Sequence, residues 1–263
     1  MANETKIQWA TATVNFWHGC KKVSDGCKYC YMFRDKERYG QEPTTVVKRD
    51  FNLIRREIKK LKEGDLIFTC SWSDFFIEEA DEWRNEAWQI IKENPHLTWQ
   101  ILTKRPQGIP ERLPADWGEG YPNVWLGVSI ESEKEITRWQ YLHILPAKVK
   151  FISFEPLLNE ITIMPSGVDW IILGGESGNN EGKYLYRKCE LKWIEEIAGY
   201  YEKERVPVFV KQLGSHLAKE LKLKDRFGGD IEEFPEHLRI REFPNNANKS
   251  PLSDSGVFDI KQG

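Results

Sequence analysis

Short apolar runs alternate along most of the chain with longer segments whose apolar residues recur at helical spacing. Seven of the runs have the length and the β-branched and aromatic content of buried strands. They cover residues 11–17, 66–70, 98–102, 124–129, 149–154, 169–173 and 206–210. Helices are predicted over residues 45–62, 81–93, 132–142 and 190–204, the third starting at a capping box of Ser132 and Glu135. Strands that alternate with helices in this way predict a mostly parallel sheet.

The number and order of these elements predict an α/β fold, an open or partial (β/α) barrel over residues 1–212. Residues 213–263 are polar and rich in Gly, Pro and Asn, so we expect a C-terminal extension that is mobile from about Asn245. No apolar run approaches the roughly 20 residues that span a bilayer, and the first residues lack an apolar signal-peptide core. We therefore expect no membrane partner.

Three of the five cysteines lie in one predicted loop, residues 17–31, with the spacing C-x6-C-x2-C. Cys20 is the first, and Cys27 and Cys30 form a C-x2-C pair preceded by Gly26, which lets the chain turn sharply. Three thiolates so close in sequence can share one metal centre and leave a coordination position open. The two other cysteines are isolated, so there is no disulfide framework, which favours a reducing cytoplasm.

Two kinds of metal centre fit this spacing. A structural zinc site would use the three cysteines and His18, in a nucleic-acid or protein binding module without catalysis. Structural zinc sites usually pair two short ligand motifs, however, and this sequence has one. The alternative is a [4Fe-4S] cluster held by three cysteines, whose fourth iron is free to bind a small molecule.

The residues Cys20, Cys27, Tyr29 and Cys30 resemble the cluster loop of the radical S-adenosylmethionine (SAM) superfamily, whose usual spacing is C-x3-C-x-aromatic-C. The second half, CKYC, matches that pattern, whereas the first spacing is six residues instead of three. The wider chain resembles a phage-associated three-cysteine family of unassigned reaction, with further similarity to spore photoproduct lyase. The motifs that carry this resemblance are WHGCKKVSDGCKYCYM, SWSDFF, LTKRP, GVSIES, FEPLL, GGESG and RIREFP.

The resemblance implies a radical SAM enzyme on a TIM-like partial barrel, with a [4Fe-4S] cluster and S-adenosyl-L-methionine as cofactors. Such an enzyme cleaves SAM reductively and uses the resulting 5′-deoxyadenosyl radical to abstract a hydrogen from its substrate. A flavodoxin- or ferredoxin-type donor would supply the electron. The relatives favour a polar substrate such as a nucleic-acid base or nucleotide, although the net charge of −3 gives no global sign of nucleic-acid binding.

Polar residues follow six of the seven predicted strands directly. Because all strands of a parallel barrel end on one face, these side chains predict a binding pocket there. They are Ser71, Ser73, Asp74, Thr103, Lys104, Arg105, Ser129, Glu131, Glu155, Glu176, Ser177, Lys211 and Gln212.

Charged residues of both signs in this set suit a polar substrate. We expect Lys104, Arg105, Glu155 and Lys211 to face it, with Arg105 and Lys211 as anchors for a phosphate. Cys70 ends the second strand, and two roles are open for it. It could donate a hydrogen atom to a substrate radical, as a cysteine does in spore photoproduct lyase, or it could be a buried core thiol.

The resemblance also implies a SAM pocket beside the cluster loop. In the superfamily the amino group of SAM is bound after the second strand. The candidates for that contact in this chain are Ser71, Ser73, Asp74 and, next, Glu176. Ser129 and Glu131 could bind the ribose, and Tyr29 could lie along the adenine.

Overall fold

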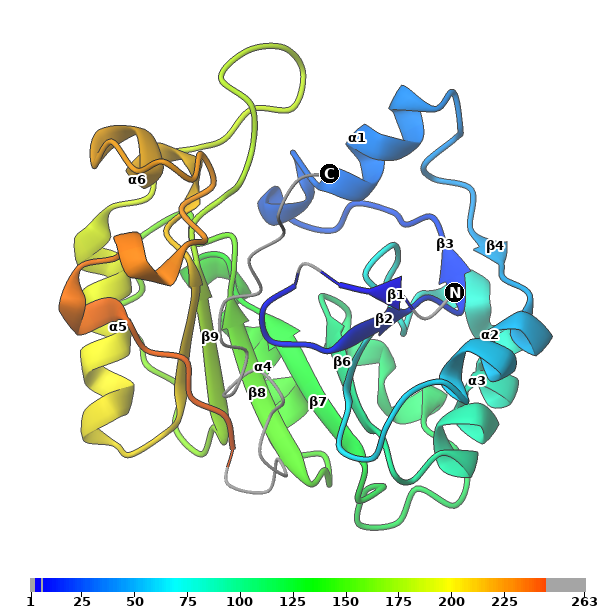
Figure 1. Ribbon diagram of the computed structural model, residues 1–263. Coiled ribbons are helices and arrows are strands. Elements are labelled where there is room, and N and C mark those ends of the chain that lie inside the picture. Colours follow the sequence, from blue (N-terminus) through cyan, green and yellow to red (C-terminus); the bar gives the residue numbers. More distant parts are fainter. Residues whose placement is uncertain (1–2, 6, 245–263) are drawn as a thin grey trace.

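The computed structural model describes residues 3–5 and 7–244, and its largest element is an eight-stranded sheet that curls into a half-barrel (Figure 1). One edge strand, β1 (Asn3–Glu4), is antiparallel to its neighbour, and the other seven strands are parallel. In both chain order and spatial order these are β2 (Ala12–Val14), β5 (Leu66–Thr69), β6 (Thr98–Thr103), β7 (Val124–Ser129), β8 (Val149–Phe154), β9 (Trp170–Gly174) and β10 (Val208–Gln212). The predicted partial barrel is thus confirmed as a fold class.

Among the described residues, five helices pack on the convex side of this sheet (Figure 1). They are α2 (Phe51–Ile58), α3 (Asp81–Glu93), α4 (Thr137–His143), α5 (Leu191–Lys203) and α6 (Gly214–Glu220). Helix α1 (Tyr31–Arg38) lies instead near the carboxyl ends of the strands, where it packs with the loop that carries the three cysteines. A separate two-stranded antiparallel sheet joins β3 (Trp17–His18) to β4 (Val47–Lys48). Between these two strands the chain forms α1 and the loop that carries Cys20, Cys27 and Cys30, which we call the cluster loop. This small sheet therefore holds together the two ends of the segment that contains the cluster loop and α1.

Two predicted helices start later than the sequence pattern suggests. The helix predicted over residues 45–62 begins at Phe51, because the carboxylate of Asp50 accepts hydrogen bonds from the amides of Asn52 and Leu53 and so caps it there. The expected capping box at Ser132 is wrong. Its hydroxyl donates to the carboxylate of Glu135 instead of binding a backbone amide, and the segment opens with a 3-10 turn.

The chain after β10 returns to the barrel within the described residues. It forms α6, which the polar composition of this region did not predict, and Arg241 then makes a β-bridge with Phe209. The ring of Phe243 stacks on Trp170 with 5.5 Å between the ring centroids. The expected mobility from about Asn245 falls on residues outside the described part of the chain.

The concave face of the sheet is filled by aromatic side chains, separately from the helix-covered core on the convex face. Strand alternation selects them: Trp125 and Phe151 point inward on β7 and β8. Gly127, the next inward position of β7, leaves room for the ring of Phe151, which a Cβ there would meet at 2.3 Å. The following inward position is Ser129, at the end of the strand. The same alternation therefore places aromatic side chains inside the half-barrel and polar side chains at the carboxyl ends of its strands.

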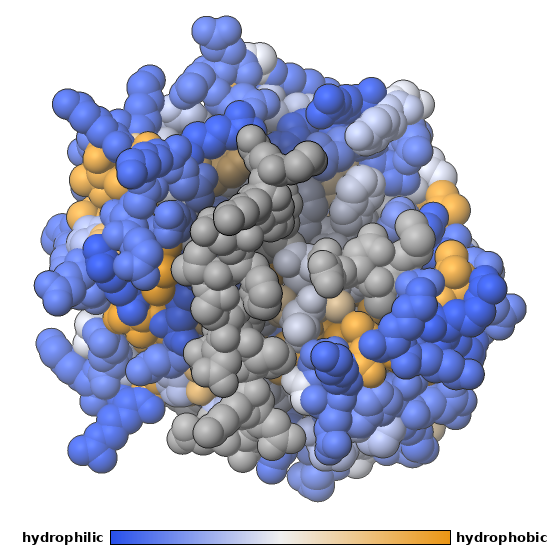
Figure 2. Space-filling model, in the orientation of Figure 1, coloured by the Kyte–Doolittle hydropathy of each residue, from blue (hydrophilic) through white to orange (hydrophobic). Residues whose placement is uncertain are grey.

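The face of the molecule seen in Figure 2 is mostly hydrophilic, with apolar residues in small separate groups. Among residues 3–5 and 7–244, no helix has the length and apolar character needed to cross a membrane.

Trp170 is the centre of the inner core and provides a test of it. Its side chain is fully buried, contacts five other aromatic rings, and donates a hydrogen bond to the carbonyl of Glu242. Trp170→Ala should lower the free energy of unfolding by about 3–5 kcal/mol, measured by urea denaturation. The control Ile144→Ala, at a 77% exposed position, should change it by less than about 0.5 kcal/mol. Equal effects of the two substitutions would contradict this description of the core.

Candidate functional site

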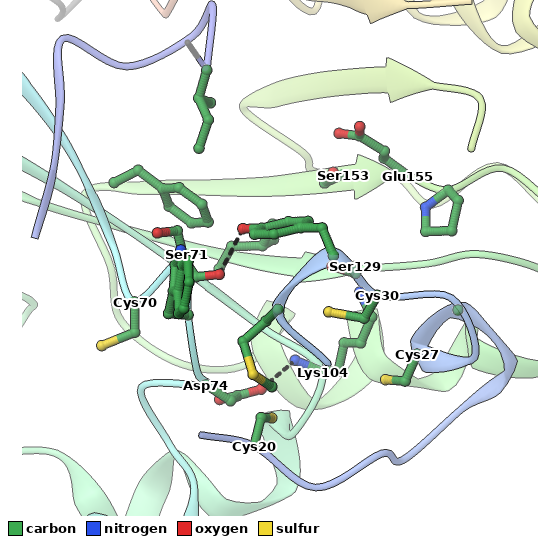
Figure 3. A pocket seen from close by; sticks show the side chains of 18 of the residues that line it. Cys20, Cys27, Cys30, Cys70, Ser71, Asp74, Lys104, Ser129, Ser153 and Glu155 are labelled. Carbon is green, nitrogen blue, oxygen red and sulfur yellow. Dashed lines mark hydrogen bonds between the residues drawn. The ribbon is translucent and has the colours of Figure 1, made fainter. Parts of the chain in front are cut away.

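A cavity of about 690 Å³ opens at the carboxyl ends of the parallel strands, between the sheet, the cluster loop and α1 (Figure 3). This volume lies within the roughly 300–1,000 Å³ of typical ligand pockets. All residues predicted to bind the cluster, SAM or the substrate line it except Glu131. The side chains that follow the parallel strands in the sequence therefore lie around one cavity.

Cys20, Cys27 and Cys30 come from one loop and line one side of the cavity (Figure 3). Two backbone hydrogen bonds brace the start of this loop, from Gly19 N to the carbonyl of Trp72 and from Cys20 N to the carbonyl of Pro43, both 3.0 Å. Gly19 has φ of 95°, and a Cβ there would lie 2.1 Å from a backbone oxygen, so only glycine fits. Cys30 is the N-cap residue of α1.

Glu131 lies beneath this loop, and the expectation that it faces the ribose in the cavity is wrong. It is buried and binds Lys104 at 3.1 Å and Arg138 at 2.7 Å, and it accepts a 3.0 Å hydrogen bond from the hydroxyl of Ser24. Burial alone would raise the pKa of Glu131, but the two cations outweigh it and hold the pKa below its usual value. A Cβ on residue 26 would lie 2.3 Å from this carboxylate, so the contact between the loop and Glu131 requires glycine at this position.

Asp74 and Arg105 form a second support of the loop. The Asp74 carboxylate accepts from the hydroxyl of Thr103 at 2.6 Å and from the amides of Phe76 and Lys104, both at 3.0 Å. It also pairs with the Arg105 guanidinium at 3.2 Å. Arg105 in turn donates to the sulfur of Cys20 at 3.6 Å and to the carbonyl of Lys21 at 2.6 Å. Protein groups thus already use both oxygens of Asp74, and Arg105 is directed at the cluster loop.

Two thiols of this loop, those of Cys20 and Cys30, are held in their neutral form. Burial, with the negative charge of Asp74, raises the pKa of Cys20 to about 12, and burial also raises the pKa of Cys30. Binding a metal here would therefore release protons. Within the described residues, no three His, Cys, Asp or Glu side chains are grouped closely enough to hold a single metal ion.

Two carboxylates that line the cavity, those of Glu155 and Glu176, form ion pairs. Glu155 accepts from Lys211 at 2.5 Å and from the amide of Gln212 at 3.1 Å, both through one carboxylate oxygen. Glu176 forms a two-point ion pair with Arg187, whose guanidinium also donates to the carbonyl of Asp25 in the cluster loop at 2.9 Å. Sequence reasoning missed Arg187, because it lies in an irregular connection with no strand before it.

The hydroxyls of Ser129 and Ser153 face the cavity from adjacent strands (Figure 3). Neither side chain has a hydrogen-bond partner among the residues that the structure describes. Ser71 and Ser73 differ from them, because the first exchanges hydrogen bonds with Asn15 and the second donates to the carbonyl of Gly19. Free polar groups for a ligand are therefore concentrated at the ends of β7 and β8.

An apolar wall that the sequence did not reveal comes from α1. Met32 and Phe33 line the cavity and pack with Tyr29, whose ring also lies under the Arg187 guanidinium at 5.2 Å. The hydroxyl of Tyr31 donates to the carbonyl of Ser71 at 2.6 Å and so links α1 to the end of β5.

Two other predicted residues lie apart from the cysteine triplet. Cys70 is 3% exposed and packs in the core on the convex side, and Figure 3 shows its sulfur directed away from the other three. Burial raises its pKa to about 12. His18 lines a different cavity and packs on Trp72, and burial, with Arg49, lowers its pKa to about 4. The zinc alternative therefore lacks its fourth ligand in this arrangement.

The fold and the site define an α/β half-barrel protein with a three-cysteine loop over the mouth of the barrel. A family model described as "Protein of unknown function (DUF5131)" matches residues 4–245, so the chain belongs to this family. No curated protein and no solved structure matches the chain.

The close contact of Gly26 with Glu131 can be tested without any cofactor. Gly26→Ala should displace the Glu131 carboxylate and lower the free energy of unfolding by about 1–3 kcal/mol, the usual cost of overpacking. Hydrogen exchange of amides in residues 20–30 should accelerate. The matched control is Gly199→Ala in α5, where a Cβ meets nothing within 4 Å and no loss is expected. Unchanged stability and exchange in Gly26→Ala would contradict the contact.

Proposed function

We propose that this protein is a radical SAM enzyme whose [4Fe-4S] cluster is held by Cys20, Cys27 and Cys30. The observation that carries the proposal is that these three thiols lie on one wall of a large cavity at the carboxyl ends of a parallel half-barrel. A ligand bound in such a cavity lies directly beside the metal centre. The resemblance of the CKYC loop to the superfamily supports the same assignment.

A cluster and a single zinc ion require different distances between the three sulfurs. One tetrahedral zinc would draw its sulfur ligands to about 4 Å from one another, since each Zn–S bond is about 2.3 Å. In a cluster each cysteine binds a different iron, so the sulfurs would stand further apart around it. Our proposal assigns the open volume that the cysteines line to a cluster, because the sequence has one short cysteine motif where structural zinc sites usually pair two.

When bound and reduced, the cluster supplies one electron that cleaves SAM into methionine and a 5′-deoxyadenosyl radical, which takes a hydrogen atom from the substrate. The chain provides two cations beside the thiolates that would hold it. Arg105 donates a hydrogen bond to the sulfur of Cys20. Burial lowers the pKa of Lys104, but the negative charge of Glu131 and then that of the Cys27 sulfur outweigh burial, so the pKa is raised. These charges offset the negative charge of thiolate ligands and stay fixed by Asp74 and Glu131.

The structure changes the expected set of SAM contacts. Asp74 has no carboxylate oxygen left for the amino group, and Glu176 is engaged by Arg187. Glu155 lines the cavity and uses one oxygen for Lys211 and Gln212, while its second oxygen has no partner among the described residues. We therefore assign the amino group to Glu155, the ribose to Ser129 and Ser153, and the adenine to the wall formed by Tyr29 and α1.

The substrate in this proposal is polar, with a nucleic-acid base or nucleotide as the favoured class. Lys211 is a cation of the cavity that is not tied to the cluster loop, and it is the candidate contact for an anionic part of the substrate. A flavodoxin- or ferredoxin-type protein is the proposed electron donor.

The cluster can be tested by anaerobic reconstitution with iron and sulfide. Wild type should bind about four irons per chain and, with dithionite and SAM, release 5′-deoxyadenosine. Cys20→Ala, Cys27→Ala and Cys30→Ala should each lose the cluster and the product. Cys189→Ala, a buried thiol outside the cavity, is the matched control and should keep both. One zinc per chain without labile sulfide would refute the proposal and favour the binding module.

A second experiment distinguishes the residue that supports the cluster loop, Asp74, from the residue that we assign to SAM, Glu155. Asp74→Ala should lose iron, because Arg105 and the start of the loop lose their anchor. Glu155→Gln should keep its iron and bind SAM about 10- to 100-fold more weakly, since a hydrogen bond to a charged group contributes about 1.5–3 kcal/mol. Iron analysis and anaerobic equilibrium dialysis with labelled SAM measure the two effects. Full iron in Asp74→Ala together with unchanged SAM affinity in Glu155→Gln would reverse these assignments.

A further inference from the structure

A second cavity, of about 380 Å³, lies beside α1 and the small sheet, outside the site described above. It is formed by the inner side of α1, the loop after it, and strands β3 and β4, which lie close together in Figure 1. None of its lining residues also lines the larger cavity. They are His18, Lys36, Gln41, Glu42, Thr45, Val47 and Arg49.

Lys36 is the unusual member of this set. The residue is only 6% exposed, yet its ammonium group forms no hydrogen bond and no ion pair with any residue of 3–5 and 7–244. Lysine is almost never buried without a partner, because the charge loses its hydration. Lys36 lines the cavity, so its charge is directed at this space.

Arg49, which is half-buried, adds a second cation to the lining of this cavity. Its backbone amide donates to the carbonyl of Phe16, which fixes the residue directly after β4. Its side-chain Nε is buried and has no partner among the described residues. Two cations of different chemistry therefore share one small cavity without a bonded counter-charge.

The carboxylates nearby in the chain have other partners. Glu42, the acid in the lining, accepts from the amide and the hydroxyl of Thr44 at 3.0 and 2.6 Å. Asp35 pairs with Arg34 and Glu37 pairs with Lys183. The cavity thus has two positive charges against one committed carboxylate.

We propose that this cavity is a binding site for a phosphate group, with Lys36 and Arg49 as its ligands. The cations of the cavity outnumber its carboxylate, which favours an anion, and phosphate oxygens suit both the point charge of lysine and the donors of arginine. Thr45, Gln41 and His18 supply further polar groups at the wall. The volume exceeds that of the bare ion, so the site can accept inorganic phosphate or a phosphate monoester.

The proposal predicts opposite effects of one substitution on stability and on binding. Lys36→Met removes an unpaired buried charge, so the free protein should gain thermal stability. It should also lose phosphate binding by at least about 10-fold, since a charge-assisted contact contributes about 1.5–3 kcal/mol. Lys219→Met, at an exposed position on α6, is the matched control and should change neither property.

The test is calorimetric titration of the full chain with inorganic phosphate and with glycerol 3-phosphate, at constant ionic strength, followed by thermal unfolding. Saturable one-to-one binding in wild type that is lost in Lys36→Met and weakened in Arg49→Gln supports the site. Tighter binding of the ester would identify a monoester as its ligand, and equal binding would identify the ion. No saturable binding in wild type, or equal binding in wild type and Lys36→Met, would overturn it. An equal rise in melting temperature in all variants would also count against it, because excluded salts stabilise any protein.

Discussion

The buried carboxylate of Glu131 is the interaction on which the site depends. It joins Lys104 after β6, Arg138 in α4 and Ser24 in the cluster loop, so that three separate parts of the chain meet on one charged group. Breaking such a buried pair leaves an uncompensated charge, which costs about 3–5 kcal/mol. The loop approaches close enough to use this anchor only because position 26 is glycine. The three cysteines therefore owe their position over the barrel to a residue that does not itself face the cavity.

Residues that look equivalent in the sequence divide into two groups in the structure. Asp74, Arg105 and Glu131 hold the cluster loop, whereas Glu155, Ser129 and Ser153 keep polar atoms directed at the cavity. The first group sets where a metal centre would lie, and the second is available to a ligand. Substitutions in the first group should therefore disturb the cluster loop, whereas substitutions in the second group should weaken ligand binding and leave the loop in place.

The sequence predicted the partial barrel because this fold class follows from the order of strands and helices along the chain. Parallel strands end on one face, so Glu155 and Lys211 could be placed there from their positions alone. Sequence could not show which polar groups are already satisfied, because the partners of Asp74 lie about 30 residues away in the chain. The positions of Arg187 and of the apolar residues of α1 near the cavity are set by the conformations of the preceding loops. No periodic sequence pattern predicts these conformations. Lys36 looked like an ordinary helix lysine until its burial was known.

We propose that three cysteines hold a cluster with one iron open to SAM. Mössbauer spectroscopy of ⁵⁷Fe-reconstituted protein, recorded with and without SAM, tests it most directly. The account predicts a [4Fe-4S] spectrum in which one of the four irons changes on addition of SAM, while the three bound by cysteine do not. A protein that assembles no cluster, or a cluster whose four irons all remain unchanged when SAM is added, would contradict it.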